Sequence, residues 1–192
     1  IVENPVAFDD TASVESWAGR AIRSIAAKGI VEGRRSGVFD PGANVTRAEF
    51  AKMLAKAAGI HGTSATETFD DVTETDWFQP YVAVLQKWGI TNGRGSTKIF
   101  APHEFITRAE IATMIARTLE LVNGQKSYSD AAAVLGKFKD QDVIHDTLKA
   151  GVAFAADYEI VRGKPGNVFD PNSYATRAEA AVMIYRMIHY LE

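Results

Sequence analysis

The tetrapeptide Thr-Arg-Ala-Glu occurs three times in this chain of 192 residues, at 46–49, 107–110 and 176–179. The copies are 61 and 69 residues apart. Two further patterns recur at the same spacings: Phe-x-Asp, beginning at Phe8, Phe69 and Phe138, and Phe-x-Pro, beginning at Phe39, Phe100 and Phe169. Three landmarks that share two spacings indicate a repeated structural unit. The second spacing is longer because a segment around Asn123–Lys137 is inserted.

Each repeat is predicted to form a helix, a loop and a second helix. In the second repeat, Asp76 can cap a first helix with apolar residues at helical spacing, and Gly89 can end it. Ser16 and Gly29 have the same roles in the first repeat. The apolar residues are Trp77, Tyr81, Val84, Leu85 and Trp88 in the second repeat, and Trp17, Ala21 and Ile25 in the first.

The second helix of each repeat is predicted to begin at the tetrapeptide, which has the form of a capping box. Its Thr accepts a hydrogen bond from the amide three residues later, and its Glu reaches back to the Thr amide. Apolar residues follow on one face: Phe50, Met53, Leu54 and Ala57; Ile111, Met114 and Ile115; Ala180, Met183, Ile184 and Met187. Because two helices cannot bury such a face alone, the repeats must pack on one another.

We therefore expect an all-α fold, in which three helix-loop-helix repeats pack as a pseudo-trimer around a central helical bundle. The repeats are assigned to 1–60, 61–122 and 123–192, within one cooperative domain. The third repeat departs from the pattern, since Thr147 stands in place of the Trp and Glu159 in place of the Gly. It is predicted to keep its second helix and to lose parts of the first helix and its exit.

Composition and charge exclude several classes of function. A net charge of −3 argues against nucleic-acid binding, and the lack of Cys excludes disulfides and thiolate metal sites. No apolar run reaches the roughly 18–20 residues that span a bilayer, and the first residues lack the features of a signal peptide. The four His have no metal-ligand spacing, so we expect no cofactor. No acidic pair recurs beyond the three capping Glu residues, so we expect no enzyme.

The arginine of the tetrapeptide is the candidate binding residue. It occupies the first helical position, where a cation beside the positive end of the helix dipole costs about 0.3–1 kcal/mol. Its presence there in three repeats suggests another use. A helix N-terminus with free amides and a guanidinium can receive a small carboxylate. The alternative is an ion pair with an Asp of a neighbouring repeat. The three residues are Arg47, Arg108 and Arg177.

A second cation follows a glycine near the start of each loop. These cations are Arg34, Arg94 and Lys164, after Gly33, Gly93 and Gly163. They stand at the opposite end of the loop from the tetrapeptide arginine. If the loop folds back, both cations of one loop face the same anion. Otherwise the loop cation is simply solvated.

The ordered combination Phe-x-Asp, Trp, Gly-Ile-x-x-Gly, Phe-x-Pro and Thr-Arg-Ala-Glu resembles the surface-layer homology (SLH) domains of bacterial cell-envelope proteins. The first two repeats carry the whole pattern, and the third lacks the Trp and the first Gly. The resemblance implies a triplet that anchors a protein non-covalently to the wall of a bacterium, typically Gram-positive. The implied location is extracellular, in the cell wall or S-layer.

The resemblance also implies a ligand and a site. The expected partner is the secondary cell wall polysaccharide linked to peptidoglycan, bound through a terminal N-acetylmannosamine that carries a 4,6-linked pyruvate. The sites are grooves between repeats, with the tetrapeptide arginine as a principal ligand of the pyruvate carboxylate. We expect the grooves built with third-repeat parts to be weakest. The competing hypothesis is a self-assembly scaffold; contacts with neighbouring S-layer subunits would involve regions outside this chain.

Sugar recognition also needs apolar faces and hydroxyl partners. Trp17 and Trp77 can stack on a sugar ring, but at the start of an apolar stripe they are expected to be core residues. The carboxylates of the Phe-x-Asp pattern either accept sugar hydroxyls or cap a first helix or turn. The recurring glycines either let backbone amides approach a ligand or serve turn geometry. The carboxylates are those of Asp10, Asp71 and Asp140. The glycines are Gly29, Gly33, Gly89, Gly93 and Gly163.

Overall fold

The computed structural model describes residues 6–61, 69–124 and 130–192, and these residues form α-helices joined by loops, with no β-strand. The expected all-α fold is confirmed. The helices are α1 (Arg20–Ala27), α2 (Arg47–Ala58), α3 (Gln79–Lys87), α4 (Arg108–Asn123), α5 (Ala131–Leu135), α6 (Lys149–Asp157) and α7 (Arg177–Ile188). Short helical turns precede some of them: η1 (Ala12–Val14), η2 (Glu15–Gly19), η3 (Gln141–Val143) and η4 (Asp146–Leu148).

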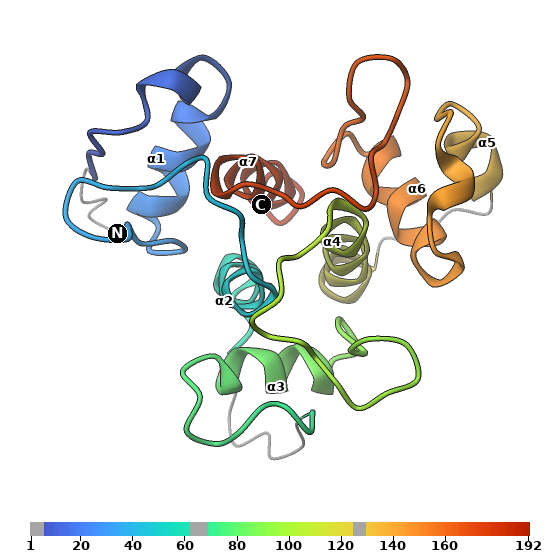
Figure 1. Ribbon diagram of the computed structural model, residues 1–192, viewed down its shortest axis with the longest axis horizontal. Coiled ribbons are helices and arrows are strands. Elements are labelled where there is room, and N and C mark those ends of the chain that lie inside the picture. Colours follow the sequence, from blue (N-terminus) through green and yellow to red (C-terminus); the bar gives the residue numbers. More distant parts are fainter. Residues whose placement is uncertain (1–5, 62–68, 125–129) are drawn as a thin grey trace.

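The second helices of the three repeats, α2, α4 and α7, lie together at the centre and are seen end-on in Figure 1. The first helices, α1, α3 and α6, lie around them. Each first helix packs on a central helix of another repeat: α1 on α7, α3 on α2 and α6 on α4. The repeats are therefore interlocked, because each one completes the packing of another.

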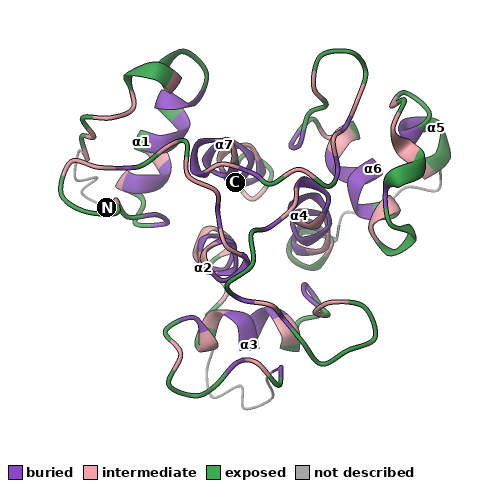
Figure 2. Ribbon diagram, viewed as in Figure 1, coloured by how far each residue is buried: buried purple, intermediate pink, exposed green. Residues whose placement is uncertain are grey.

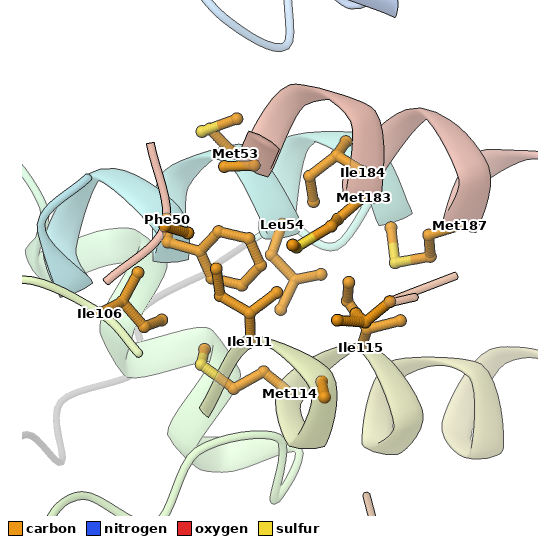
Figure 3. Close-up of a cluster of buried hydrophobic side chains, with 14 of the residues drawn as sticks. Phe50, Met53, Leu54, Ile106, Ile111, Met114, Ile115, Met183, Ile184 and Met187 are labelled. Carbon is orange, nitrogen blue, oxygen red and sulfur yellow. The ribbon is translucent and has the colours of Figure 1, made fainter. Parts of the chain in front are cut away.

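The core lies between the three central helices, whose facing sides are buried (Figure 2). Phe50 and Leu54 of α2, Ile111 and Ile115 of α4, and Ile184 of α7 are fully buried there (Figure 3). These are the residues of the predicted apolar faces. Truncating one of them, such as Leu54→Ala, is expected to cost about 2–5 kcal/mol of stability.

The central helices begin at the tetrapeptides, as predicted. The hydroxyl of Thr46, Thr107 and Thr176 accepts a hydrogen bond from the amide of the Glu three residues later, at 3.1–3.2 Å. The reciprocal bond of a full capping box occurs at Thr107. In the other two repeats the Thr hydroxyl donates to Oε1 of the Glu instead. The Thr and one Glu oxygen thus close each helix.

A ring of backbone hydrogen bonds ties the three repeats together just before the central helices. The Val45 amide donates to the Ala175 carbonyl at 3.1 Å, Ala175 to Ile106 at 3.3 Å, and Ile106 back to Val45 at 2.9 Å. One residue from each repeat takes part. The N-terminal ends of α2, α4 and α7 are therefore held in a fixed arrangement.

The first helices differ from the prediction at their starts. Asp76 does not cap α3, since its Oδ2 accepts from the Thr73 amide at 2.8 Å in a preceding turn. The helix begins at Gln79, and Pro80 in its first turn lacks an amide that would need a partner. In the first repeat, Ser16 lies within the π-helical turn η2 rather than at a cap.

The third repeat keeps its first helix, so the predicted loss of parts of that helix and its exit was wrong. The helix α6 has nine residues, and Glu159 adopts a left-handed backbone with φ of 55°, against 72° at both Gly29 and Gly89. Such a backbone is strained for a residue with a side chain, by about 1–2 kcal/mol. It is held here because the Glu159 and Ile160 amides bond to carbonyls of the last helical turn.

The inserted segment adds to the helical structure. The helix α4 has 16 residues, against 12 in α2 and α7, and α5 follows and packs on α6. Part of the insertion, 125–129, lies outside the described residues. Within the described ranges, none of the helices combines the length and apolar character needed to cross a membrane.

Candidate functional site

The three tetrapeptide arginines lie buried between repeats. Arg47, Arg108 and Arg177 expose only 3%, 4% and 6% of their surface. The Nε of each donates to the carbonyl of the Phe in another repeat's Phe-x-Pro, at 2.7, 3.0 and 2.8 Å. Each guanidinium also lies over the ring of that Phe, 4.7–5.3 Å from the centroid. The arginines therefore join one repeat to the next.

The same arginines form a closed ring of ion pairs with the tetrapeptide glutamates. Arg47 pairs with Glu110, Arg108 approaches Glu179 at 3.6 Å, and Arg177 donates to Glu49 at 3.3 Å. The expected alternative use of these arginines, an ion pair across repeats, is thus present, but the partner is the Glu of another tetrapeptide rather than an Asp. Each Glu caps its own helix with one oxygen and receives an arginine with the other.

The amides at the helix starts are not free, so the prediction that free amides there receive a carboxylate was wrong. The amides of Arg47, Arg108 and Arg177 donate to loop carbonyls of another repeat at 2.8–2.9 Å, and the next amides do the same at 3.0–3.1 Å. The third amide is taken by the Thr hydroxyl. The interlocking of the repeats satisfies these donors, which sequence spacing within one repeat cannot reveal.

Burial changes the acidity of these cations. It lowers the pKa of Arg47 to about 10, with the nearby charge of Arg94 acting in the same direction. Burial, followed by the charge of Arg34, lowers the pKa of Arg177, and burial also lowers that of Arg108. Nearby carboxylates oppose this shift, foremost Glu104 at Arg47, Glu179 at Arg108 and Glu49 at Arg177.

The loop cations also meet the tetrapeptide glutamates. Arg34 Nη2 lies 3.6 Å from Glu49, the partner of Arg177, and Arg94 Nη2 lies 3.7 Å from Glu110, the partner of Arg47. Two cations do converge on one anion, but they come from different repeats, and the anion is a side chain of the protein. In the third repeat, Lys164 pairs with Asp170 at 2.5 Å.

Two surface grooves lie over these clusters. Groove 1 runs beside α2 between Arg177, Trp77 and the Ile30–Glu32 segment, and Lys52 and Lys56 also line it. Groove 2 runs beside α4 over Arg47, Arg94 and Arg117, and opens toward His145 and Tyr174. Both grooves combine parts of all three repeats. The expectation that grooves built with third-repeat parts bind most weakly stays a prediction.

The tryptophans expected in the core are at the surface. Trp17 and Trp77 are 51% and 54% exposed, and the equivalent Thr147 is also exposed. Their positions precede the regular part of the first helices, so the core-facing stripe starts after them. Trp77 borders groove 1, where Lys52 Nζ lies 5.7 Å from its ring centroid. Trp88, counted in the same stripe, is exposed at the other end of α3.

The aspartates of the Phe-x-Asp pattern fix the loops. Both oxygens of Asp10 accept amides, from Phe39 at 2.9 Å and Asp40 at 2.8 Å, and Asp71 and Asp140 repeat this arrangement. The second donor in each pair has a left-handed backbone, with φ near 60°. Burial raises the pKa of Asp10, but the Phe39 and Asp40 amides outweigh it, and the net pKa is lowered. These carboxylates therefore stabilise a turn, one of the two roles expected of them.

The glycines follow packing and turn geometry. A Cβ at Gly33, Gly93 or Gly163 would lie 2.6–2.8 Å from the ring of the Phe that starts the repeat. Gly29 and Gly89 have φ of 72° at the exits of the first helices and border open space. Of the glycines expected near a ligand, Gly93 alone lines a groove in the described part of the chain.

Sequence reasoning missed a third recurring cation, nine residues after each tetrapeptide arginine. Lys56, Arg117 and Arg186 donate to a carbonyl at the exit of their own repeat's first helix, at 3.2, 3.3 and 3.4 Å. Lys56 and Arg117 line the grooves. The signal was available, because these residues recur at the spacings of the tetrapeptide. Lys52, which has no basic counterpart in the other repeats, gave no such signal.

Comparison with known proteins identifies the repeated unit. Residues 7–51, 68–112 and 137–181 each match the S-layer homology domain. The exoglucanase XynX of Acetivibrio thermocellus is 35% identical over 98% of this chain, which is 17% of that protein. An amylopullulanase of Thermoanaerobacterium thermosulfurigenes is 36% identical over 91% of the chain and 9% of its own length. The S-layer protein sap of Bacillus anthracis is 29% identical over 88% of the chain and 20% of its own length.

The chain therefore spans at most a fifth of the length of these relatives. What it shares with two enzymes and an S-layer protein is a common module, and the enzyme names describe those proteins. The three matched stretches cover most of the chain and contain every arginine and glutamate of the ring. With the sequence pattern, the repeated fold and these matches in agreement, the chain belongs to the S-layer homology domain family.

Proposed function

We propose that this chain is a non-covalent cell-wall anchor that binds secondary cell wall polysaccharide in its inter-repeat grooves. The family supports anchoring at the cell surface, because the module recurs in S-layer proteins and in surface enzymes. The finer proposal is that the ligand is the pyruvylated terminal N-acetylmannosamine of the polymer, on the wall of a Gram-positive bacterium. A shared module attached to unrelated proteins suits an anchor better than a catalytic domain.

The observation that carries the proposal is an excess of positive charge in the grooves. Groove 1 is lined by three cations, Lys52, Lys56 and Arg177, and by two carboxylates, Glu32 and Glu49. Arg34 adds a further cation next to the groove, where it pairs with Glu49 and Asp40. In groove 2, Arg47, Arg94 and Arg117 face Glu104 and Glu110. The chain as a whole has a net charge of −3. A positive groove on an acidic protein favours an anionic ligand at that place.

The exposed cations are the groups that a carboxylate can reach. Arg34 and Lys52 are partly exposed, whereas the donors of Arg177 already bond to the Phe39 and Glu32 carbonyls and to Glu49. We therefore assign first contact with the ligand to Arg34 and Lys52. The buried arginine adds charge from beneath and holds Glu49 in place. This assigns the tetrapeptide arginine a different part from that of principal ligand.

Trp77 supplies the apolar surface that a sugar ring needs. Its ring is half-exposed at the edge of the positive groove. An exposed aromatic ring at the edge of a positive groove is suited to a carbohydrate that carries a negatively charged substituent. A self-assembly scaffold needs an apolar surface but no cluster of cations. The charge pattern therefore favours the glycan anchor over the scaffold.

The proposal is tested by co-sedimentation with purified cell-wall sacculi. We expect the chain to sediment with intact sacculi and to remain in solution with sacculi stripped of the secondary polymer or of its pyruvate. Raised salt should weaken the binding, because screening shortens the range of the groove charges. Equal binding to intact and stripped sacculi would contradict the glycan mechanism, and self-association in the absence of sacculi would favour the scaffold.

A further inference from the structure

The three repeats differ at the position three residues after the tetrapeptide Glu, which lines a groove in the first two repeats. This position holds Lys52 in α2, Thr113 in α4 and Val182 in α7. Lys52 lines groove 1 and is half-buried, whereas Thr113 and Val182 are buried. The internal repeat therefore offers a comparison in which the surrounding fold is kept and this side chain changes.

Thr113 cannot act as Lys52 does. Its hydroxyl donates to the Ala109 carbonyl of its own helix at 3.0 Å. The helix α6 also packs closely over it, since a Cβ on Gly151 would lie 2.5 Å from Thr113. Thr113 therefore lines groove 2 with only 3% of its surface exposed. In groove 1, Lys52 reaches the surface instead, with its ammonium group 5.7 Å from the ring centroid of Trp77 and 6.0 Å from that of Tyr81.

The position of Trp77 also differs among the repeats, and it does not change together with the position of Lys52. Trp77 borders groove 1, and the equivalent residue in groove 2 is Thr147. The equivalent Trp17 belongs to η2, which packs on α7, where Val182 takes the place of Lys52. In the described part of the chain, groove 1 is thus the place where an accessible cation and an exposed indole stand together.

This pairing suits an acidic sugar. A carboxylate bonded to the Lys52 ammonium lies directly beside the indole, because the ammonium is held over that ring. The apolar face of the same sugar can then meet the exposed part of Trp77. Arg34, whose Nη2 lies 3.6 Å from Glu49 of the same groove, adds a second cation. Groove 1 can therefore bind both the carboxylate and the apolar face of one sugar.

We propose that groove 1 is the tightest site of this chain for an acidic sugar, and that Lys52 is the residue that sets its preference for the acidic over the neutral form. The inference rests on the proposed glycan-anchoring function and goes beyond it, since it makes groove 1 and groove 2 unequal. Groove 2 is wide, but it lacks both groups. Groove 1 is expected to fill first when ligand is limiting.

Calorimetric titration of the full chain tests this, with synthetic pyruvylated N-acetylmannosamine and its neutral parent as the two probes. The variant Lys52→Thr copies the second repeat, and Trp77→Thr copies the third. A charged hydrogen bond is worth enough that Lys52→Thr should weaken binding of the acidic sugar about tenfold or more. Binding of the neutral sugar should change little. Trp77→Thr should weaken both sugars.

Lys137→Thr serves as the matched control, because it removes the same charge from an exposed residue away from both grooves. It should bind as the unmodified chain does, and equal melting temperatures would show that all variants are folded. If Lys52→Thr binds the acidic sugar as tightly as the control, the assignment of groove 1 is wrong while the anchoring function stands. If the unmodified chain binds neither the sugar nor polymer-bearing sacculi, the proposed function itself fails.

Discussion

We expect the main role of the buried arginines to be the stabilisation of the fold. The variant Arg177→Ala measures how much stability one of them contributes. In the folded chain, Arg177 donates to the Phe39 and Glu32 carbonyls at 2.8 and 2.9 Å and to Glu49 at 3.3 Å, with 6% of its surface exposed. Its removal leaves a carboxylate and two carbonyls without these donors. Losing one partner of a buried ion pair typically costs about 3–5 kcal/mol.

That loss is large enough to measure by thermal unfolding. In a domain of 192 residues, each kcal/mol shifts the melting temperature by about 2–4 °C, so we expect Arg177→Ala to lower it by about 6–20 °C. Arg23→Ala is the matched control, since Arg23 pairs with Glu15 at 2.6 Å but both side chains are half-exposed. An exposed pair contributes less than about 1 kcal/mol.

Circular dichroism of the two variants at the same concentration gives the comparison. Equal melting temperatures for Arg177→Ala and Arg23→Ala would refute the structural role of the ring. The prediction also bears on binding experiments. A triple substitution of the tetrapeptide arginines would abolish binding through unfolding alone, so loss of binding in that variant says nothing about which residues touch the glycan.

Three further predictions concern the fold. Gly163→Ala should destabilise by about 1–3 kcal/mol because its Cβ would lie 2.6 Å from the Phe138 ring, whereas Gly42→Ala, with open space around it, should be neutral in the same denaturant titration. The pKa of Asp10 is lower in the folded chain than in the unfolded chain, so the stability that this carboxylate contributes is complete above about pH 4 and is lost as the pH falls through the folded pKa. The melting temperature should therefore fall as the pH is lowered below about 4. It should fall less steeply in Asp10→Asn, which has no carboxylate to protonate. Deleting 123–192 should abolish cooperative unfolding, because α1 then loses α7; a sharp transition in the shortened chain would contradict the interlocked core.

Local signals predicted the helices well. The Thr of each tetrapeptide accepts the amide that the capping pattern requires, and the apolar stripe after it is buried. These features depend on residues within one turn or one helix face, so spacing along the chain is sufficient to predict them. Glu159 shows the limit of such patterns, since a non-glycine residue adopts the backbone of the glycine that it replaces.

The site was harder to predict because it is made between repeats. Spacing within one repeat correctly indicated that Arg47 has a role other than capping. Its partner, Glu110, belongs to another repeat and lies 63 residues away in sequence. The same holds for the helix amides, which bond to loops of another repeat. Trp77 was expected in the core because the helical stripe was extended one turn too far; α3 begins at Gln79. Contacts across repeats decide these outcomes, and a single repeat does not contain them.

The three tryptophans allow a direct test of where the glycan binds. Trp77 borders groove 1, Trp88 is equally exposed at the other end of α3, and Trp17 lies beside α7. Titration with pyruvylated N-acetylmannosamine, followed through the three indole N–H signals by NMR, reports on each place separately. We predict that the Trp77 signal moves first and that the Trp88 signal stays in place. A titration in which Trp88 shifts and Trp77 does not would contradict binding in the inter-repeat groove.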